Sequence, residues 1–230
     1  MKWLTIEEKE KIKLSSSFKQ LLNGMLLGDG TLKQECTYPS FWIEQNDEEF
    51  VKHLWEEFKK HNLVNSPYKR RIKIEKRLNK DGFPYKDSIT YRFSSCSLPY
   101  FQKLMRKWYT LSGEIDKRGR TKKTKIVPKD LKLTLITFAY WIAGDGSFNK
   151  KGGYVIICTN SFEKAEVIFL AELIFKNFGI KAVVFSRSKR LIPEKKEYMI
   201  RFTRSEVKKI QELISKVLFK TMLYRIGVDL

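Results

Sequence analysis

The chain has 230 residues, of which 42% are apolar and 31% charged, so its composition predicts a folded globular protein with one large domain or two small ones. Its 46 lysine and arginine residues outnumber 26 aspartate and glutamate residues, and the formal charge of +20 favours a polyanionic partner, above all nucleic acid. No apolar run approaches the roughly 20 residues of a membrane helix, and three cysteines without a CxxC pair exclude a zinc knuckle and a disulfide framework.

The first predicted unit opens with an apolar helix, from about residue 15, that ends in the motif Gly28-Asp29-Gly30. Apolar spacing then predicts a strand, an amphipathic helix, the two strands of a basic hairpin with a turn at 79–82, and a closing helix. In chain order these five elements lie at residues 40–46, 47–63, 68–77, 88–94 and 98–109.

A basic segment follows the first unit. Six of the nine residues from Lys117 to Lys125 are basic, and the run has no apolar face. We therefore expect residues 117–129 to form an exposed linker. Its charge is compatible with a solvated tether and with a nucleic-acid contact, and the sequence leaves both interpretations open.

The second unit repeats the first. Residues 138–146 read FAYWIAGDG, so a second apolar helix ends in Gly144-Asp145-Gly146. A carboxylate is unfavourable at this end of a helix, where the backbone carries partial negative charge, so two such placements indicate a shared purpose. Gly179 is the predicted C-cap of the next helix, and Ser205 the predicted N-cap of the last one. The later elements lie at residues 154–160, 161–179, 183–192, 197–203 and 205–218, with a hairpin turn at 193–196.

The repeat predicts the fold class. Each unit has the order α-β-β-α-β-β-α, and its two hairpins pair into a four-stranded antiparallel sheet. We expect an α+β protein with pseudo-twofold symmetry and units at residues 1–116 and 130–230, whose two sheets form a DNA-binding saddle. Strand alternation would place Ile, Tyr and Phe inward and the basic and hydroxyl side chains outward, toward the major groove. The predicted DNA-binding side chains are Lys69, Arg71, Lys73, Arg92, Arg187, Lys189, Arg190 and Arg201.

The two motif segments resemble the paired signature of the LAGLIDADG homing endonucleases, in particular their monomeric, two-motif branch. The signature letters fall on residues 22–30 and 138–146, and the same order of elements follows each copy. The resemblance implies that the two signature helices pack together at the centre of the molecule, where small residues let their backbones approach. Those small residues are Gly24, Gly28, Ala139, Ala143 and Gly144.

The resemblance also implies an active site. Asp29 and Asp145 would face each other across a short gap, where two carboxylates repel unless a cation lies between them. Oxygen ligands suit Mg²⁺, with Mn²⁺ as a substitute, and the carbonyls of Gly28 and Gly144 are candidates for further ligands. The implied reaction is metal-dependent hydrolysis of one phosphodiester on each strand, which makes a double-strand break in a long asymmetric DNA site.

Four polar side chains complete the implied catalytic set. Lys125 and Arg225 would neutralise charge on the reacting phosphate, although an arginine, where the family often has lysine, is a poor proton acceptor. Gln45 and Asn160 stand at the ends of matching strands and would orient water at the metals. Capping of the following helix is the alternative role for these two amides.

Other functions stay open on the same fold. An RNA maturase would bind its own intron RNA, with or without cleavage, whereas a non-cleaving DNA-binding regulator would have no use for both aspartates. The junction residues of an intein are not apparent, which favours a free-standing protein, and the resemblance to the two-motif branch implies a monomer. The N-terminal segment has no apolar signal core, so we expect an intracellular protein without a membrane partner. The habit of the family suggests an organelle, either mitochondrion or chloroplast.

Overall fold

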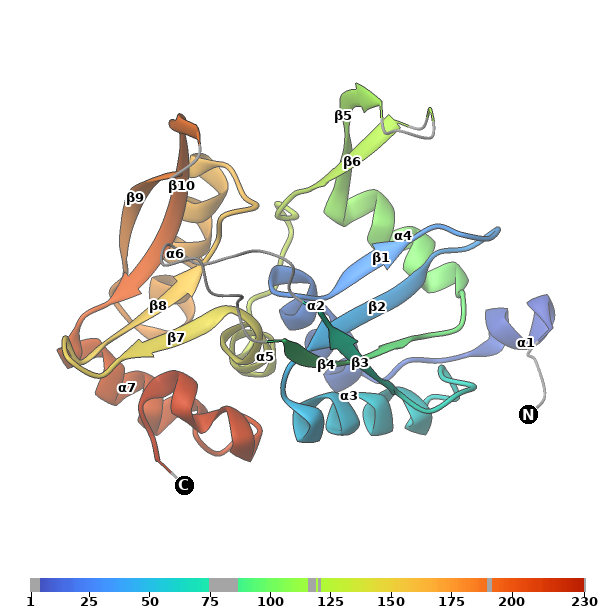
Figure 1. Ribbon diagram of the computed structural model, residues 1–230, viewed down its shortest axis with the longest axis horizontal. Helices are drawn as coiled ribbons and strands as arrows, with labels where there is room; N and C mark the ends of the chain where they lie inside the picture. Colours follow the sequence, from blue (N-terminus) through green and yellow to red (C-terminus); the bar gives the residue numbers. More distant parts are fainter. Residues whose placement is uncertain (1–4, 75–86, 116–118, 120, 190–191, 230) are drawn as a thin grey trace. The chain divides into compact units, whose positions relative to one another are not determined.

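The computed structural model describes residues 5–74, 87–115, 119, 121–189 and 192–229, and the chain forms two compact units (Figure 1). The first unit comprises residues 1–15 and 29–102, and the second comprises residues 16–28 and 103–230. The first motif helix, α2 (Ser16–Leu27), therefore packs in the second unit, although the repeat assigns it to the first copy. The boundaries at residues 116 and 130 stay a prediction.

The first unit is built on a four-stranded antiparallel sheet. Its elements are α1 (Ile6–Lys11), β1 (Thr31–Lys33), β2 (Ser40–Gln45), α3 (Glu48–Lys60), β3 (Lys69–Lys73), β4 (Ser88–Ser94) and the start of α4 (Pro99–Trp108). The strand order is β1-β2-β4-β3, and α3 runs along one face of the sheet (Figure 1). Asp47 starts α3 by accepting a hydrogen bond from the Phe50 amide. The ring of Phe58 in α3 lies 4.9 Å from that of Phe41 and 5.1 Å from that of Phe93, which joins helix and sheet in one core.

The second unit repeats this arrangement. Besides α2 and the end of α4 its elements are β5 (Tyr109–Ile115), β6 (Thr121–Lys125), α5 (Leu135–Asp145), β7 (Gly146–Asn149), β8 (Tyr154–Cys158), α6 (Lys164–Phe178), β9 (Val183–Lys189), β10 (Ile192–Phe202), α7 (Arg204–Ile214) and a 3-10 helix, η1 (Lys220–Ile226). Its sheet has the order β7-β8-β10-β9. Buried Phe138 of α5 contacts Phe178 and Phe202, with ring centroids 5.3 and 6.2 Å apart. The predicted α+β class and both four-stranded sheets are confirmed.

Two local predictions in the second unit are wrong. The turn expected at residues 193–196 lies inside β10, whose pairing with β9 shifts register between Ile192 and Lys196. Proline lacks the amide hydrogen of a regular ladder, so Pro193 fits such an irregular position. Helix α7 begins one residue before the expected cap: the carbonyl of Thr203 accepts the first helical bonds, and Ser205 lies in the first turn. Gly179, with φ of 65°, is the left-handed C-cap of α6 as predicted.

Part of the basic segment forms a strand. Residues 121–125 form β6, which pairs with β5 into a separate two-stranded sheet that continues directly from α4 (Figure 1). Thr121–Thr124 are exposed, as the sequence predicts. The hairpin turn expected at 79–82 lies outside the described residues. No helix within the described ranges is long and apolar enough to cross a bilayer.

Candidate functional site

Helices α2 and α5 approach each other closely inside the second unit. A Cβ atom added to Gly24 would lie 2.5 Å from the carbonyl oxygen of Thr137 and 2.8 Å from the Cβ of Tyr140, distances that real Cβ atoms do not show. The Thr137 hydroxyl donates to the carbonyl of Gln20 at 3.1 Å, and the Thr134 hydroxyl donates to the Gln20 side-chain oxygen at 2.7 Å. The two motif helices are therefore held in direct contact by one glycine and by hydroxyl groups.

The described motif glycines are not left-handed helix stops, and close packing requires glycine at one of them, Gly146. The Gly28 amide still donates to the carbonyl of Gly24 at 3.2 Å, so the helical hydrogen bonding continues into the motif. Gly146 caps α5 with φ of −71° and ψ of 147°, an extended conformation open to any residue. A Cβ on Gly146 would nevertheless lie 2.5 Å from the Ile142 carbonyl oxygen. Local crowding next to the aspartate therefore requires glycine at position 146.

Asp29 has a direct hydrogen-bond partner in the first unit. The Gln45 side-chain nitrogen donates to Asp29 Oδ2 at 2.6 Å. Gln45 ends β2 and is 7% exposed, whereas Asp29 is exposed. A buried amide that donates to a carboxylate favours the ionised, acceptor form of that carboxylate and fixes its direction. The proximity of these two predicted residues is thus observed, and the role of Gln45 in orienting water stays a prediction.

Asp145 is the last residue of α5 and lies beside the backbone of Gly28, within the second unit. A Cβ built on Gly28 would lie 3.6 Å from the Cα of Gly144 and 3.7 Å from the Cγ and Oδ2 of Asp145. The carboxylate of the second motif therefore borders the first motif at the residue that precedes Asp29. The two-carboxylate metal site predicted from Asp29 and Asp145 joins residues of both units and stays a prediction.

Each predicted catalytic cation reaches a carbonyl of one motif. The Lys125 ammonium donates to the carbonyl oxygen of Gly28 at 3.0 Å, and the Arg225 guanidinium donates through Nη1 to that of Gly146 at 2.7 Å. The Nε of Arg225 is buried and has no hydrogen-bond partner in the described part of the chain, and its guanidinium lies 5.1 Å from the Tyr224 ring centroid. Lys125 and Arg225, separated in sequence, thus both point at the ends of the motif helices.

Asn160 does not occupy the position equivalent to Gln45. Thr31, the residue after the first motif, pairs with Trp42, and Ser147, the residue after the second, pairs with Ile156. Counting three residues onward from each partner aligns Gln45 with Thr159. The Thr159 hydroxyl is buried and donates to the Tyr198 carbonyl at 2.6 Å, whereas Asn160 lies in an exposed turn. The two sites thus differ at this strand end, and the catalytic role of Asn160 stays a prediction.

The open face of the first sheet carries the predicted basic side chains. Strand pairing places Lys69, Arg92 and Glu44 in one row, and the next row holds Arg71 and Thr90. The Glu44 carboxylate accepts from the Thr90 hydroxyl at 2.7 Å and lies 3.7 Å from Arg71. Sequence reasoning missed Trp42 on this face, whose ring lies 4.0 Å below the Lys33 ammonium. The alternation of strand 40–46 was the signal that could have found it.

The isoleucines of β3 are less buried than predicted, although Ile72 pairs with Ile89 and so lies on the same sheet face as buried Phe93. Ile72 is 53% exposed and Ile74, just after the strand, is 69% exposed. Strand β3 is at the edge of its sheet, whereas α3 packs chiefly on the central strands β2 and β4, which leaves these two side chains exposed.

The corresponding face of the second sheet is more apolar than predicted. Arg201 pairs with Ile156 and Val183, and its guanidinium lies 5.8 Å from the Tyr154 ring centroid and 5.6 Å from that of Phe185. Aromatic and aliphatic side chains that were expected inward therefore share the outer face with the arginine. Among the remaining predicted contacts, Arg187 is exposed on β9, Lys73 and Lys189 end β3 and β9, and Arg190 lies outside the described residues.

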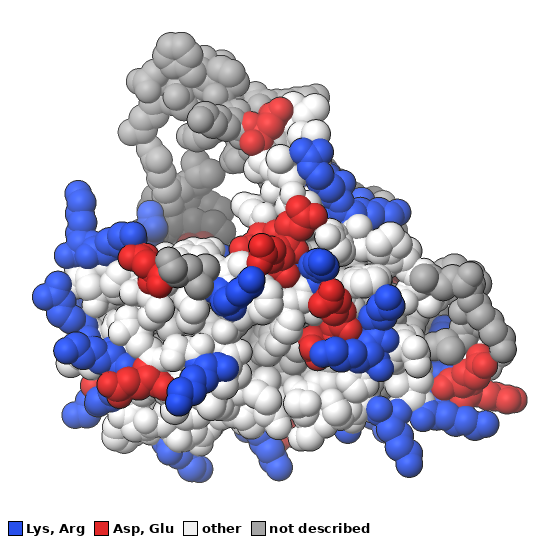
Figure 2. Space-filling model, turned by 90° about the horizontal axis from the view of Figure 1, so that it is seen from below, with Lys and Arg blue, Asp and Glu red and all other residues white. Residues whose placement is uncertain are grey.

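Exposed basic side chains are not confined to the two sheets, because Lys52 and Lys59 of α3 and Lys208 of α7 are exposed as well. Figure 2 shows Lys and Arg side chains along the left, lower and right parts of the face it draws and near its middle, with Asp and Glu in smaller groups among them. Sequence-independent attraction to a polyanion follows from such a distribution, whereas a defined contact needs side chains held in place.

The sequence pattern of the LAGLIDADG DNA endonuclease family matches residues 19–210. The chain belongs to this family. It is 28% identical over 138 residues to a probable intron-encoded DNA endonuclease 3 of Mycosarcoma maydis, covering 60% of this chain and 93% of that relative. It is 26% identical over 158 residues to the cytochrome b mRNA maturase bI2 of Saccharomyces cerevisiae, covering 67% of this chain but only 34% of the maturase.

Among solved structures, the homing endonuclease I-WcaI bound to its DNA recognition sequence matches with a TM-score of 0.74. The match covers 98% of this chain and 93% of that structure at 19% identity, which shows a shared fold. The family and fold predicted from the two motifs are thereby confirmed.

Proposed function

We propose that this protein is a site-specific homing endonuclease, which makes a double-strand break in a long asymmetric DNA site by Mg²⁺-dependent hydrolysis. The observation that carries the proposal is the pair of GDG motifs on packed helices, each contacted by a predicted catalytic cation. Two further facts support phosphodiester hydrolysis: the chain belongs to the endonuclease family, and it carries Asp29 and Asp145 at the ends of two helices.

The donor atoms present fit a hard divalent ion. Asp29 and Asp145 supply carboxylate oxygens and Gly28 and Gly144 supply carbonyls, the ligand type that Mg²⁺ prefers, with Mn²⁺ as a substitute. Within the described residues no three His, Cys, Asp or Glu side chains gather as a metal cluster, so backbone carbonyls and water would complete the ligand set. A bound divalent ion would acidify water and stabilise charge on the leaving oxygen.

Three side chains of the protein would hold the catalytic carboxylate and neutralise charge on the reacting phosphate. Gln45 holds the Asp29 carboxylate by its hydrogen bond. Lys125, half-buried at the end of β6, is fixed at the Gly28 carbonyl and would stabilise negative charge developing on the phosphate. Arg225 would do the same beside the second motif, where its permanent charge suits stabilisation of phosphate but not proton abstraction.

A cleavage selection tests the proposal. The purified chain is incubated with a library of random and intron-junction DNA in Mg²⁺ or Mn²⁺, and the ends are sequenced. We expect ends that share one long asymmetric site, lost with EDTA and reduced about 10²–10³-fold or more in Asp29→Asn and Asp145→Asn. Both variants should still bind DNA. The matched control is Asp229→Asn, which removes an exposed carboxylate in a weak surface pair with Lys150.

Binding without cuts under either metal would refute the endonuclease. An RNA maturase is then the second candidate, because one relative is named a maturase. Splicing of the chain's own intron RNA, retained in Asp29→Asn, would support it. The further proposals are a monomer in solution, tested by light scattering, and an organellar location, tested by cell fractionation.

A further inference from the structure

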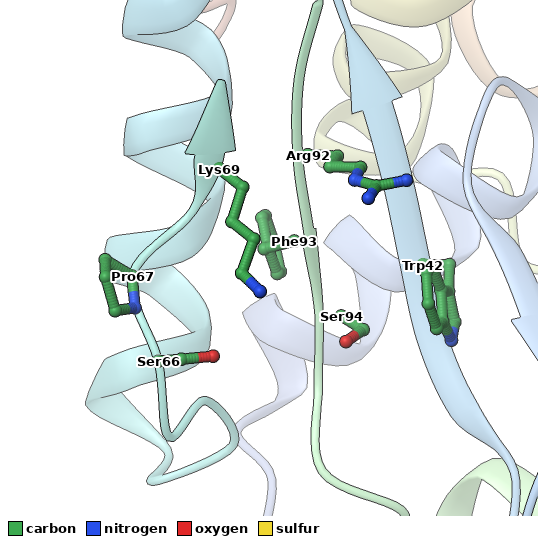
Figure 3. A pocket seen from close by; sticks show the side chains of 7 residues that line it. All are labelled: Trp42, Ser66, Pro67, Lys69, Arg92, Phe93 and Ser94. Carbon is green, nitrogen blue, oxygen red and sulfur yellow. The ribbon is translucent and has the colours of Figure 1, made fainter. Parts of the chain in front are cut away.

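A small pocket opens in the first unit beside the outer row of β3 and β4. It has a volume of about 110 Å³, and its wall includes Trp42, Ser66, Lys69, Arg92 and Ser94 (Figure 3). Trp42 comes from β2, Ser66 from the loop before β3, and the remaining three from the two adjacent strands. In Figure 3 the Lys69 amine points toward Ser66 and Ser94, and the Arg92 guanidinium lies over the strand that carries Trp42.

The two cations of this pocket have no counterion. Lys69 and Arg92 are directly paired across β3 and β4, yet neither forms an ion pair or a side-chain hydrogen bond with the described residues. Glu44 shares their row, but its carboxylate is directed to Thr90 and Arg71. Like charges placed directly opposite each other destabilise a sheet. A bound anion would supply the counter-charge that these two cations lack among the described residues.

The other side chains of the pocket indicate which kind of anion would bind there. The hydroxyls of Ser66 and Ser94 form no hydrogen bonds among the described residues and can donate to an oxygen. The Trp42 indole nitrogen already donates to Ser40 at 2.9 Å, and Lys33 above its ring adds positive potential. Two cations and two hydroxyl donors suit a group with several acceptor oxygens. The volume of about 110 Å³ leaves room for one phosphate group beside these donors.

We propose that the pocket of Trp42, Lys69 and Arg92 seats one backbone phosphate of the bound DNA and so sets the register of the duplex on the first sheet. This inference rests on the proposed function, because it takes DNA as the partner. It assigns Lys69 and Arg92 to positioning through the backbone. Base reading then falls to other side chains of the sheet face.

The salt dependence of binding separates these roles. Affinity is measured in EDTA, where cleavage cannot interfere, on random duplexes and on the duplex recovered by the cleavage selection. In Lys69→Gln and Arg92→Gln we expect the slope of log affinity against log salt to become shallower by about 1. The ratio of variant to wild-type affinity should therefore rise about 3–4-fold between 50 and 200 mM salt, because the variant loses less affinity as salt is added. The preference for target over random DNA should not change.

Two controls distinguish a phosphate seat from general charge or damage. Lys52→Gln removes an exposed lysine from α3, the helix on the opposite face of the sheet, and should leave the slope unchanged. Lys69→Arg keeps the charge and should retain the wild-type slope. Because Lys69→Gln relieves a like-charge pair, its Tm should equal or exceed that of the wild type.

Two outcomes would overturn the proposal. A wild-type slope in both glutamine variants would show that no phosphate is neutralised there. Loss of preference at one base pair, with binding to random DNA intact, would show that the pair reads a base. Both outcomes leave the proposed cleavage untouched, because a protein whose variants give either result can still cut its target. Conversely, a protein that binds DNA but never cuts it can still show the predicted change in salt slope.

Discussion

Replacement of Gly24 by alanine tests whether the motif helices are held together by backbone contact. The added Cβ would lie 2.5 Å from the Thr137 carbonyl oxygen, 2.8 Å from the Tyr140 Cβ and 3.2 Å from the Thr137 carbonyl carbon. Two of these atoms belong to the backbone of α5 and cannot turn aside as a flexible side chain would. The helices must therefore separate or slide, which disturbs packing next to both aspartates.

The magnitude follows from two opposing effects. Overpacking of a close-packed contact costs typically 1–3 kcal/mol, and the backbone collision favours the upper half of that range. Alanine in place of glycine in a helix interior returns about 1 kcal/mol. The free energy of unfolding should therefore fall by about 1–2 kcal/mol, which lowers the Tm of a chain of this size by roughly 2–8 °C.

The matched control is Gly28→Ala, at the residue that directly follows the same helix and faces the same partner helix. There the added Cβ would meet its nearest neighbours at 3.6 and 3.7 Å, ordinary van der Waals distances. Its effect on stability should stay within about 1 kcal/mol of zero. Thermal and urea unfolding are followed by circular dichroism for the wild type and both variants. Equal stability of Gly24→Ala and Gly28→Ala would refute the argument from the helix crossing.

Three further predictions follow from single contacts. Gln45→Glu places a second carboxylate against Asp29 and raises the pKa of Asp29 by repulsion. The acidic limb of the pH dependence of the cleavage rate should therefore move to higher pH. Gln45→Leu should lower the cleavage rate without that shift. Lys125→Met removes the ammonium at the Gly28 carbonyl and should lower kcat on the order of 10²-fold, with DNA affinity nearly unchanged; a larger loss of affinity than of kcat would contradict its role. Burial lowers the pKa of His53, so the unfolded chain binds the extra proton near pH 6.5. The free energy of unfolding should then decrease as pH falls below that value. In His53→Gln this decrease should be smaller. An equal decrease in the variant would show that another group causes it.

The repeat, the two GDG motifs and the amphipathic helices are local patterns, and for that reason the sequence predicted them correctly. Residues 47–63 carry their apolar face, cap and charged last turn within a single segment, and α3 forms there. The hairpin strands were also found, because period-two spacing is readable over a few residues. Family membership followed from two such patterns one domain apart.

Where the prediction failed, the deciding partner was distant in the chain. The pairing of β10 with β9 includes residues 193–196 in the strand, a register that no local turn signal reveals. Exposure of Ile72 depends on which strands α3 covers, and the apolar outer face of the second sheet depends on neighbours in β8 and β9. Residues 121–125 carry no apolar face, yet they pair with β5, a partner that their local composition does not reveal.

The candidate site divides in the same way. The sequence by itself determined which residues carry the chemistry, because carboxylates at the negative ends of two helices are unfavourable without a function. Only the tertiary structure decided which groups touch them: the amide of Gln45 at Asp29, the ammonium of Lys125 at Gly28, and the guanidinium of Arg225 at Gly146. Contacts between residues tens of positions apart depend on packing, and packing depends on the whole core at once.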